Sequence, residues 1–142
     1  MSHSVALRDA LARVPLFQAC SKRDLQIISR HMQVVAVAQG AVLMREGESG
    51  DAFYIVLEGS ATVDRGGHIV GGVWVGDYVG ELALLDPAPR SATVRAATPL
   101  LLGVLDARAF AAIVRDVPAL SNKLLKALAR RLRSRDNQAT VT

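Results

Sequence analysis

The spacing of apolar residues changes twice along this chain of 142 residues, and that change most constrains its fold. Residues 5–32 place apolar side chains every three or four positions, with Pro15 breaking the run and Ser21 preceding a second segment. From Gln33, short runs rich in Val, Ile, Leu, Phe and Tyr alternate with glycine-containing turns. Helical spacing returns at Asp106. The sequence therefore predicts two short N-terminal helices, a β-rich centre and C-terminal helices.

The β-rich centre is divided by its turns into short strands. Gly66 and Gly67 separate two apolar-rich runs by two residues, which indicates a tight hairpin. The last two runs carry closely spaced apolar residues that suit the inside of a sandwich or barrel, so we expect the strands to close on themselves. The expected class is α+β, an antiparallel β-barrel of jelly-roll type flanked by N-terminal helices and two C-terminal helices. The expected strands are 34–37, 41–45, 52–57, 60–64, 68–75, 92–97 and 100–105.

The C-terminal region is expected to form two helices. Asp106 is a good N-cap for the first, which carries Phe110, Ile113 and Val114 on one face. Asp116 and Pro118 open the second. This helix carries Leu120 and an apolar stripe that could pack on its own barrel, pair with a second copy as a homodimer, or pair with a partner. That stripe is Leu124, Leu125, Leu128 and Leu132.

Length and composition indicate a single domain, with residues 1–137 folded and 138–142 a flexible tail. No stretch approaches the roughly 18 apolar residues of a membrane span, and a cytoplasmic protein is expected. The single cysteine, Cys20, cannot form an intrachain disulfide. Residues 1–120 hold 11 basic and 12 acidic residues, and residues 121–142 hold six and one. A solvated helical face explains this basic end better than a nucleic-acid or lipid contact.

The segment 76–91 carries the chemistry. Gly80 permits close backbone approach, and residues 81–85 can form a helical turn whose free N–H groups suit an anion such as phosphate. Arg90 can pair with phosphate oxygens and Ser91 can add a hydroxyl donor. Glu81 would repel a bare phosphate, but it could accept a hydrogen bond from a hydroxyl beside that phosphate. The alternative is an ordinary surface turn with an Arg–Glu ion pair.

These residues resemble the cyclic-nucleotide-binding domains of bacterial catabolite activator proteins, protein kinase A regulatory subunits and cyclic-nucleotide-gated channels. Gly80-Glu81-Leu82-Ala83-Leu84, followed after five residues by Arg90-Ser91-Ala92-Thr93-Val94, looks like the phosphate-binding cassette of that family. The block from Arg45 to Gly59 resembles its glycine-marked turn and central strand. The resemblance covers roughly residues 7–135.

The resemblance implies a role for each cassette residue. Glu81 takes the ribose 2′-hydroxyl, and Ser91 bonds an exocyclic phosphate oxygen. The backbone of Gly80, Glu81, Leu82 and Ala83, together with the Arg90 side chain, holds the cyclic phosphate. Serine after the arginine goes with cAMP in this family, whereas threonine favours cGMP. We therefore expect cAMP as the ligand, with cGMP as a second candidate, and no further cofactor or metal.

The resemblance also implies that the last helix moves over the purine. Aligning Pro118 with the proline that opens this helix in the family brings Arg131, Arg135 and Asp136 near the base, with Arg131 the first candidate. The alternative is that all three face water. Leu82 resembles a leucine that senses the ligand and presses on a hinge helix, here the one with Phe110 and Ile113.

Three other functions fit the sequence less well than nucleotide binding. After Arg135 only seven residues follow, so no helix-turn-helix and no sequence-specific DNA binding are expected. A metal-dependent enzyme is not expected because His3, His31 and His68 fall in a terminus, a helix and a hairpin. The alternative to nucleotide binding is an interaction or dimerisation module of the same fold with a vestigial site. Its protein partner is not indicated by the sequence.

Overall fold

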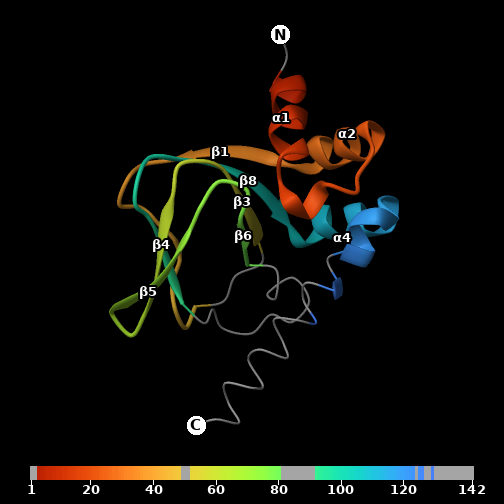
Figure 1. The fold of residues 1–142 in the computed structure, drawn as a ribbon. Helices are drawn as coiled ribbons and strands as arrows, with labels where there is room; N and C mark the ends of the chain where they lie inside the picture. Colours follow the sequence, from red (N-terminus) through yellow and green to blue (C-terminus); the bar gives the residue numbers. More distant parts are fainter. Residues whose placement is uncertain (1–2, 49–51, 81–91, 124, 127–128, 130–142) are drawn as a thin grey trace.

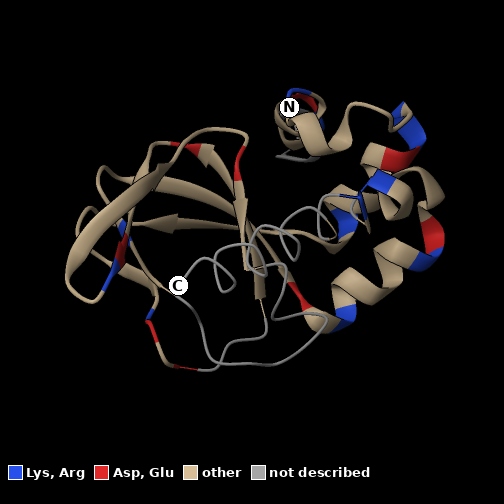
Figure 2. Cartoon of the chain, turned by 60° about the horizontal axis from the view of Figure 1, so that its bottom comes forward, with Lys and Arg blue, Asp and Glu red and all other residues tan. Residues whose placement is uncertain are grey.

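Two four-stranded antiparallel sheets are stacked, with helices gathered on one side of them (Figure 1). The computed structural model describes residues 3–48, 52–80, 92–123, 125–126 and 129. The described helices are α1 (His3–Ala12), the 3₁₀ helix η1 (Pro15–Phe17), α2 (Lys22–His31) and α4 (Ala107–Asp116). Helices from both ends of the chain thus lie together, beside the sheet that contains β3 and β8, as the second view in Figure 2 also shows.

The N-terminal helices follow local signals in the sequence. Pro15 opens η1, where its missing N–H costs nothing. Ser21 caps α2: its hydroxyl accepts from the Asp24 N–H at 3.1 Å, and the Asp24 carboxylate accepts from the Ser21 N–H at 3.0 Å. The two expected helices are confirmed, with a 3₁₀ turn between them. Cys20 lies half-buried before α2, and this burial, with Asp24 nearby, raises the pKa of its thiol.

The strands divide into two sheets whose order differs from their order in the chain. The first sheet is β1 (Gln33–Val37), β8 (Leu100–Asp106), β3 (Ala52–Glu58) and β6 (Tyr78–Val79). The second is β2 (Val42–Met44), β7 (Thr93–Ala96), β4 (Ala61–Arg65) and β5 (His68–Val73). All the expected strands are present. The hairpin at Gly66 and Gly67 is confirmed, with Arg65 paired to His68 and both glycines at positive φ.

The strand predictions were wrong at two places. Residues 78–79 were expected in a non-strand segment, but they form β6 against β3. The run 68–75 was expected to be one strand, but β5 ends at Val73. Trp74 and Asp77 instead close a turn, in which the Asp77 N–H donates to the Trp74 carbonyl at 2.9 Å. Trp74 and Val75 are apolar, so their residue types alone favour a continued strand.

The expectation of a closed barrel is also corrected. Among the described strands, every ladder lies within one of the two sheets, and none joins the edges β1 or β6 to the edges β2 or β5. Two of the four edge strands are short: β6 has two residues, and β2 has three with a register shift. These two edges offer few backbone groups for a ladder between the sheets. A sandwich of two antiparallel sheets results.

The core has two apolar clusters on opposite faces of β3 and β8. Phe53, Ile55 and Leu105 face the helices, where they pack with Phe17, Ile28, Phe110 and Ile113. Val56 and Leu102 face the second sheet and pack with Ala61, Val73 and Val94. Because β3 is covered on both faces, its apolar residues are nearly continuous instead of alternating.

The C-terminal helices begin as the sequence indicates. The Asp106 carboxylate accepts from the Ala109 N–H at 2.8 Å, so the predicted N-cap of α4 is confirmed. Residues 118–123 and 125–126 are helical, which places the start of the second helix at Pro118. Leu120 is buried and Leu125 is exposed. The remaining leucines of the expected stripe, Leu124, Leu128 and Leu132, lie outside the described residues, as does the expected tail 138–142.

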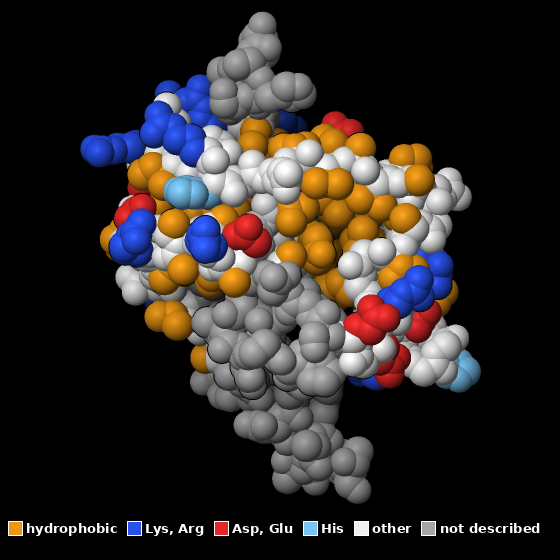
Figure 3. Space-filling view, turned by 180° about the vertical axis from the view of Figure 1, so that it is seen from behind, with side chains coloured by type: hydrophobic (Ala, Val, Ile, Leu, Met, Phe, Trp, Pro, Cys, Tyr) orange, Lys and Arg blue, Asp and Glu red, His pale blue; other side chains and the backbone are white. Residues whose placement is uncertain are grey.

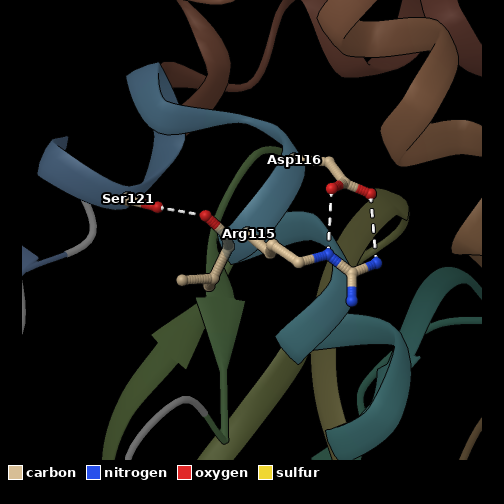
Figure 4. Close-up of polar contacts among 4 residues, drawn as sticks. Arg115, Asp116 and Ser121 are labelled. Carbon is tan, nitrogen blue, oxygen red and sulfur yellow. Dashed lines mark hydrogen bonds and ion pairs between the residues drawn. The ribbon is translucent and has the colours of Figure 1, made fainter.

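The start of this second helix is hydrogen-bonded to other helices of the molecule. The Ser121 hydroxyl donates to the Val114 carbonyl at 2.7 Å (Figure 4), and the Lys123 ammonium donates to the Pro15 carbonyl at 2.5 Å. These contacts tie residues 118–123 both to α4 and to η1. Within the part of the chain that the structure describes, no helix has the length and apolarity needed to cross a membrane.

Candidate functional site

Of the residues predicted for the site, the structure describes Gly80. It also describes the strands on either side of the segment 81–91. The other predicted site residues lie outside the described residues: Glu81, Leu82, Ala83, Arg90, Ser91, Arg131 and Arg135. The arrangement that can be reported is therefore the frame around 81–91. It consists of β6 and Gly80 before the segment, and Ala92 with β7 after it.

The strand that leads into the segment ends in a conformation that suits glycine. In β6, Tyr78 pairs with Ile55 and Val79 pairs with Tyr54 of β3. Gly80 follows with φ +91°, a region that residues with a Cβ rarely adopt. Another residue here would strain the backbone at the point where the chain leaves the first sheet. Gly80 was selected from the sequence for close backbone approach to a ligand, and that role stays a prediction.

A hydrogen-bonded turn before β6 holds this strand against β3. The Asp77 carboxylate accepts from the Trp74 N–H at 2.8 Å and closes the turn from inside. Two backbone hydrogen bonds join this turn to Val56: the Gly76 N–H donates to the Val56 carbonyl at 2.9 Å, and the Val56 N–H donates to the Asp77 carbonyl at 3.0 Å. The start of the candidate site is thus held by the inner strand β3, although β6 itself is short.

The other end of the segment is fixed to the second sheet. Ala92 is buried, and β7 runs between β2 and β4. The Thr93 hydroxyl oxygen accepts from the Glu46 N–H at 3.0 Å, and the Glu46 carboxylate accepts from the Gly66 N–H at 2.9 Å. Glu46 therefore links the chain after β2, the β4–β5 hairpin and the start of β7. The segment 81–91 connects an edge of one sheet with an inner strand of the other.

Replacing Thr93 with valine should loosen this anchor. Thr93→Val keeps the shape and the strand preference but leaves the Glu46 N–H without its acceptor. We expect a loss of about 1 kcal/mol in the free energy of unfolding, measured by urea denaturation. The matched control is Thr62→Val in β4, whose hydroxyl donates to the Arg95 carbonyl at 3.5 Å. Equal losses in the two variants would contradict a specific role for Thr93.

Three aromatic rings connect the start of the site to α4. The Tyr78 ring stacks on Phe53 with 5.4 Å between ring centroids, and Phe53 lies 5.7 Å from Phe110. Tyr78 belongs to β6, Phe53 to β3 and Phe110 to α4. Phe110 and Ile113 were predicted on a hinge helix, and both are buried in the helix-side cluster. Sequence reasoning missed Tyr78 because no period marks a strand of two residues.

The comparison with protein families gives one decisive match. Residues 34–116, from β1 to the end of α4, match the family model described as the cyclic nucleotide-binding domain. The chain belongs to the cyclic nucleotide-binding domain family. The resemblance drawn from the sequence is confirmed. The match includes Gly80, the segment 81–91 and both strands that hold its ends.

Relatives of this cyclic nucleotide-binding domain include regulators and a kinase subunit. The CRP-like cAMP-activated global transcriptional regulator of Mycobacterium tuberculosis is 30% identical over 134 residues, which cover 91% of this chain and 60% of the relative. The cAMP-dependent protein kinase regulatory subunit of Mycosarcoma maydis is 42% identical over 91 residues, covering 61% and 17%. The chain therefore spans less than two thirds of the length of these relatives.

The fold of the domain agrees with a solved structure. The catabolite activator protein of Thermus thermophilus superposes with a TM-score of 0.81 at 29% identity, covering 89% of this chain and 62% of that one. The relatives named here have regulatory functions, as a transcriptional regulator, a kinase subunit and an activator protein. Within the residues that the structure describes, no three His, Cys, Asp or Glu side chains form a group suited to a metal ion.

Proposed function

We propose that this domain binds a cyclic nucleotide, cAMP in preference to cGMP, and acts as a regulatory sensor without catalysis of its own. The observation that carries the proposal is the family match across residues 34–116, which contains a complete cassette sequence from Gly80 to Ser91. The names of the relatives from Mycobacterium tuberculosis and Mycosarcoma maydis both state a dependence on cAMP, which supports this choice of ligand.

In the proposed site each cassette residue meets one part of the ligand. The Glu81 carboxylate accepts a hydrogen bond from the ribose 2′-hydroxyl. The Arg90 guanidinium and the backbone N–H groups of residues 80–83 hold the cyclic phosphate, because a guanidinium offers paired, directional donors to phosphate oxygens. Ser91 donates to an exocyclic phosphate oxygen. The positive φ of Gly80 supports this arrangement because it lets the chain turn out of β6 at the start of the cassette.

Comparative titration tests the choice of ligand. Calorimetry of the whole chain with cAMP and with cGMP should give saturable binding for both, with the lower dissociation constant for cAMP. No heat at millimolar concentrations of either nucleotide would overturn the proposal and favour an interaction module with a vestigial site. Tighter binding of cGMP would overturn the cAMP preference alone. Hydrolysis of cAMP by the purified chain would contradict a purely regulatory role.

Removing the Arg90 side chain should weaken cAMP binding by about 2 kcal/mol or more, which is roughly thirtyfold in the dissociation constant. The reason is the loss of a charge-assisted pair with the phosphate. The measurement is a calorimetric titration of Arg90→Ala. The matched control is Arg95→Ala, which removes the same charge from exposed Arg95 in β7. Unchanged affinity in Arg90→Ala, or an equal loss in both variants, would contradict the assigned phosphate contact.

The proposed regulatory output is a movement of the last helix over the purine, with Arg131 and Arg135 as candidate contacts to the base. Ligand would draw in Leu82 and shift α4, which changes the balance between two conformations of the domain. The ring contacts from Tyr78 through Phe53 to Phe110 support this coupling, because they join the strand before the cassette to α4.

Distance measurements test this movement. Two spin labels, at Arg65 in the second sheet and at Lys126 in the last helix, report the position of that helix. They are introduced in a Cys20→Ala background because Cys20 is the one native cysteine. We expect the distance distribution to change when cAMP saturates the site. The same distribution with and without cAMP, at concentrations where calorimetry shows binding, would overturn the movement and leave ligand binding intact.

A further inference from the structure

A basic hollow lies on the helical side of the molecule, between α2, α4 and the start of the last helix. Its volume is about 560 Å³, and its basic lining residues are Arg23, Arg30, His31 and Arg115. A smaller hollow of about 290 Å³ adjoins it and shares Arg30 and His31. Figure 3 shows several Lys and Arg side chains near a histidine on this side of the molecule, with some Asp and Glu side chains among them. None of these residues belongs to the cassette or its frame.

Helical geometry sets the spacing of the charges on α2. Arg23, Ile27 and Arg30 are separated by four and three residues, so they lie on one face of α2. The two arginines are about 10 Å apart along the helix axis, at a rise of about 1.5 Å per residue. In extended conformations the two guanidinium groups suit two separate anionic groups. Ile27 stands between them, and Pro118 contributes a second apolar residue to the lining.

The hollow carries unbalanced positive charge. Arg115 and Asp116 form a paired contact, with Nε to Oδ1 at 3.0 Å and a second nitrogen to Oδ2 at 3.4 Å (Figure 4). This hydrogen bonding lowers the pKa of the Asp116 carboxyl, with a smaller contribution from the charge of His31. Among the described residues, neither Arg23 nor Arg30 has an acidic partner. Two guanidinium groups are therefore available to an incoming anion.

We propose that this hollow binds an acidic segment of a partner protein, in which two carboxylates flank an apolar side chain. One carboxylate meets Arg23, the other meets Arg30, and the apolar side chain covers Ile27 and Pro118. The Arg115 guanidinium is exposed, so it can leave the Asp116 carboxylate and pair with a carboxylate of the partner. An acidic peptide fits these features better than a nucleic acid, because a phosphate backbone has no apolar group to cover Ile27 and Pro118.

The proposal is independent of nucleotide binding and is tested on the nucleotide-free full chain. The probe is a fluorescein-labelled peptide of ten residues, with two pairs of glutamates flanking a pair of leucines. Its binding is measured by fluorescence anisotropy at 0.15 M salt, the ionic strength at which exposed charges are screened beyond about 8 Å. A peptide with glutamine in place of each glutamate is the neutral comparison. The variant is Arg23→Gln with Arg30→Gln, and the matched control is Arg13→Gln with Arg65→Gln.

We expect the acidic peptide to bind the unchanged chain and the control variant equally, and the Arg23→Gln, Arg30→Gln variant at least about tenfold more weakly. The glutamine peptide should bind the unchanged chain with a dissociation constant at least as high as that of the acidic peptide for the Arg23→Gln, Arg30→Gln variant. Equal weakening in both double variants would mean nonspecific attraction and would overturn the proposal. Displacement of the peptide by tripolyphosphate or a DNA duplex at equal or lower concentration would also overturn it, because the hollow would then select phosphates.

Discussion

Replacing Phe53 with alanine is expected to cost about 3–5 kcal/mol in the free energy of unfolding, the range for a large aromatic removed from a packed core. Phe53 is 1% exposed and contacts rings on two other elements, Tyr78 of β6 and Phe110 of α4. The cavity would open between β3 and the helices, where few side chains can move in to fill it. Urea denaturation followed by circular dichroism measures the loss.

A second variant separates stability from coupling. Phe53→Leu keeps an apolar side chain of similar size, so we expect a loss below about 1.5 kcal/mol. It removes the ring that joins Tyr78 to Phe110, and the cAMP-dependent distance change at the last helix should shrink. If Phe53→Ala had the same free energy of unfolding as the unchanged chain, this would contradict the described packing of Phe53 in the core. A Phe53→Leu variant with the full distance change would contradict the ring contacts as the route of coupling.

Replacing Gly59 with alanine is expected to cost at least about 3 kcal/mol, although the change adds a single methyl group. Gly59 has φ +89°, and a Cβ there would collide with the Pro99 carbonyl oxygen and lie 2.7 Å from the Thr98 hydroxyl. That hydroxyl accepts from the Ser60 N–H at 3.0 Å, so moving it would break the contact between the β3–β4 and β7–β8 turns. The loss is measured by thermal and urea denaturation.

Gly40 provides the matched control for this prediction. Its φ is also +89°, but an added Cβ would meet nothing within 4 Å. Gly40→Ala should therefore show the backbone cost alone, about 1–2 kcal/mol. The difference between the two variants measures the collision at Pro99. If both alanines cost the same, the close approach of the two turns at Gly59 does not restrict the site.

The strand before the cassette is connected to the helical side of the molecule through β3. The strand before the cassette, β6, is paired to β3, and β3 carries Phe53 and Ile55 on the face that packs against α4. In the proposed movement, a displacement of β6 would reach the helices through these packed side chains, which have little free space around them. The basic hollow between α2 and α4 lies on the same helical side. A partner bound there would contact one of the helices that the proposed movement displaces.

The sequence by itself determined the kinds of elements, their caps and the family. Ser21, Asp24 and Asp106 act on N–H groups within three residues of themselves, and Gly66 with Gly67 forms a hairpin whose requirements are local. The family was indicated by the cassette residues because their types and spacing resemble those of its other members. Such signals are complete within a short stretch of chain, so no knowledge of distant neighbours is needed to interpret them.

Only the tertiary structure decided how the strands divide into sheets and which residues meet across them. The β6 strand exists because Gly76, Asp77 and Tyr78 lie against β3, and two residues carry no period that would indicate it. The stacking of Tyr78 on Phe53 and the hollow between α2 and α4 both involve residues that are far apart in the chain. The same is true of the strands on either side of the gap between the sheets. Their energies depend on distances that exist only after folding, which is why local patterns could not predict them.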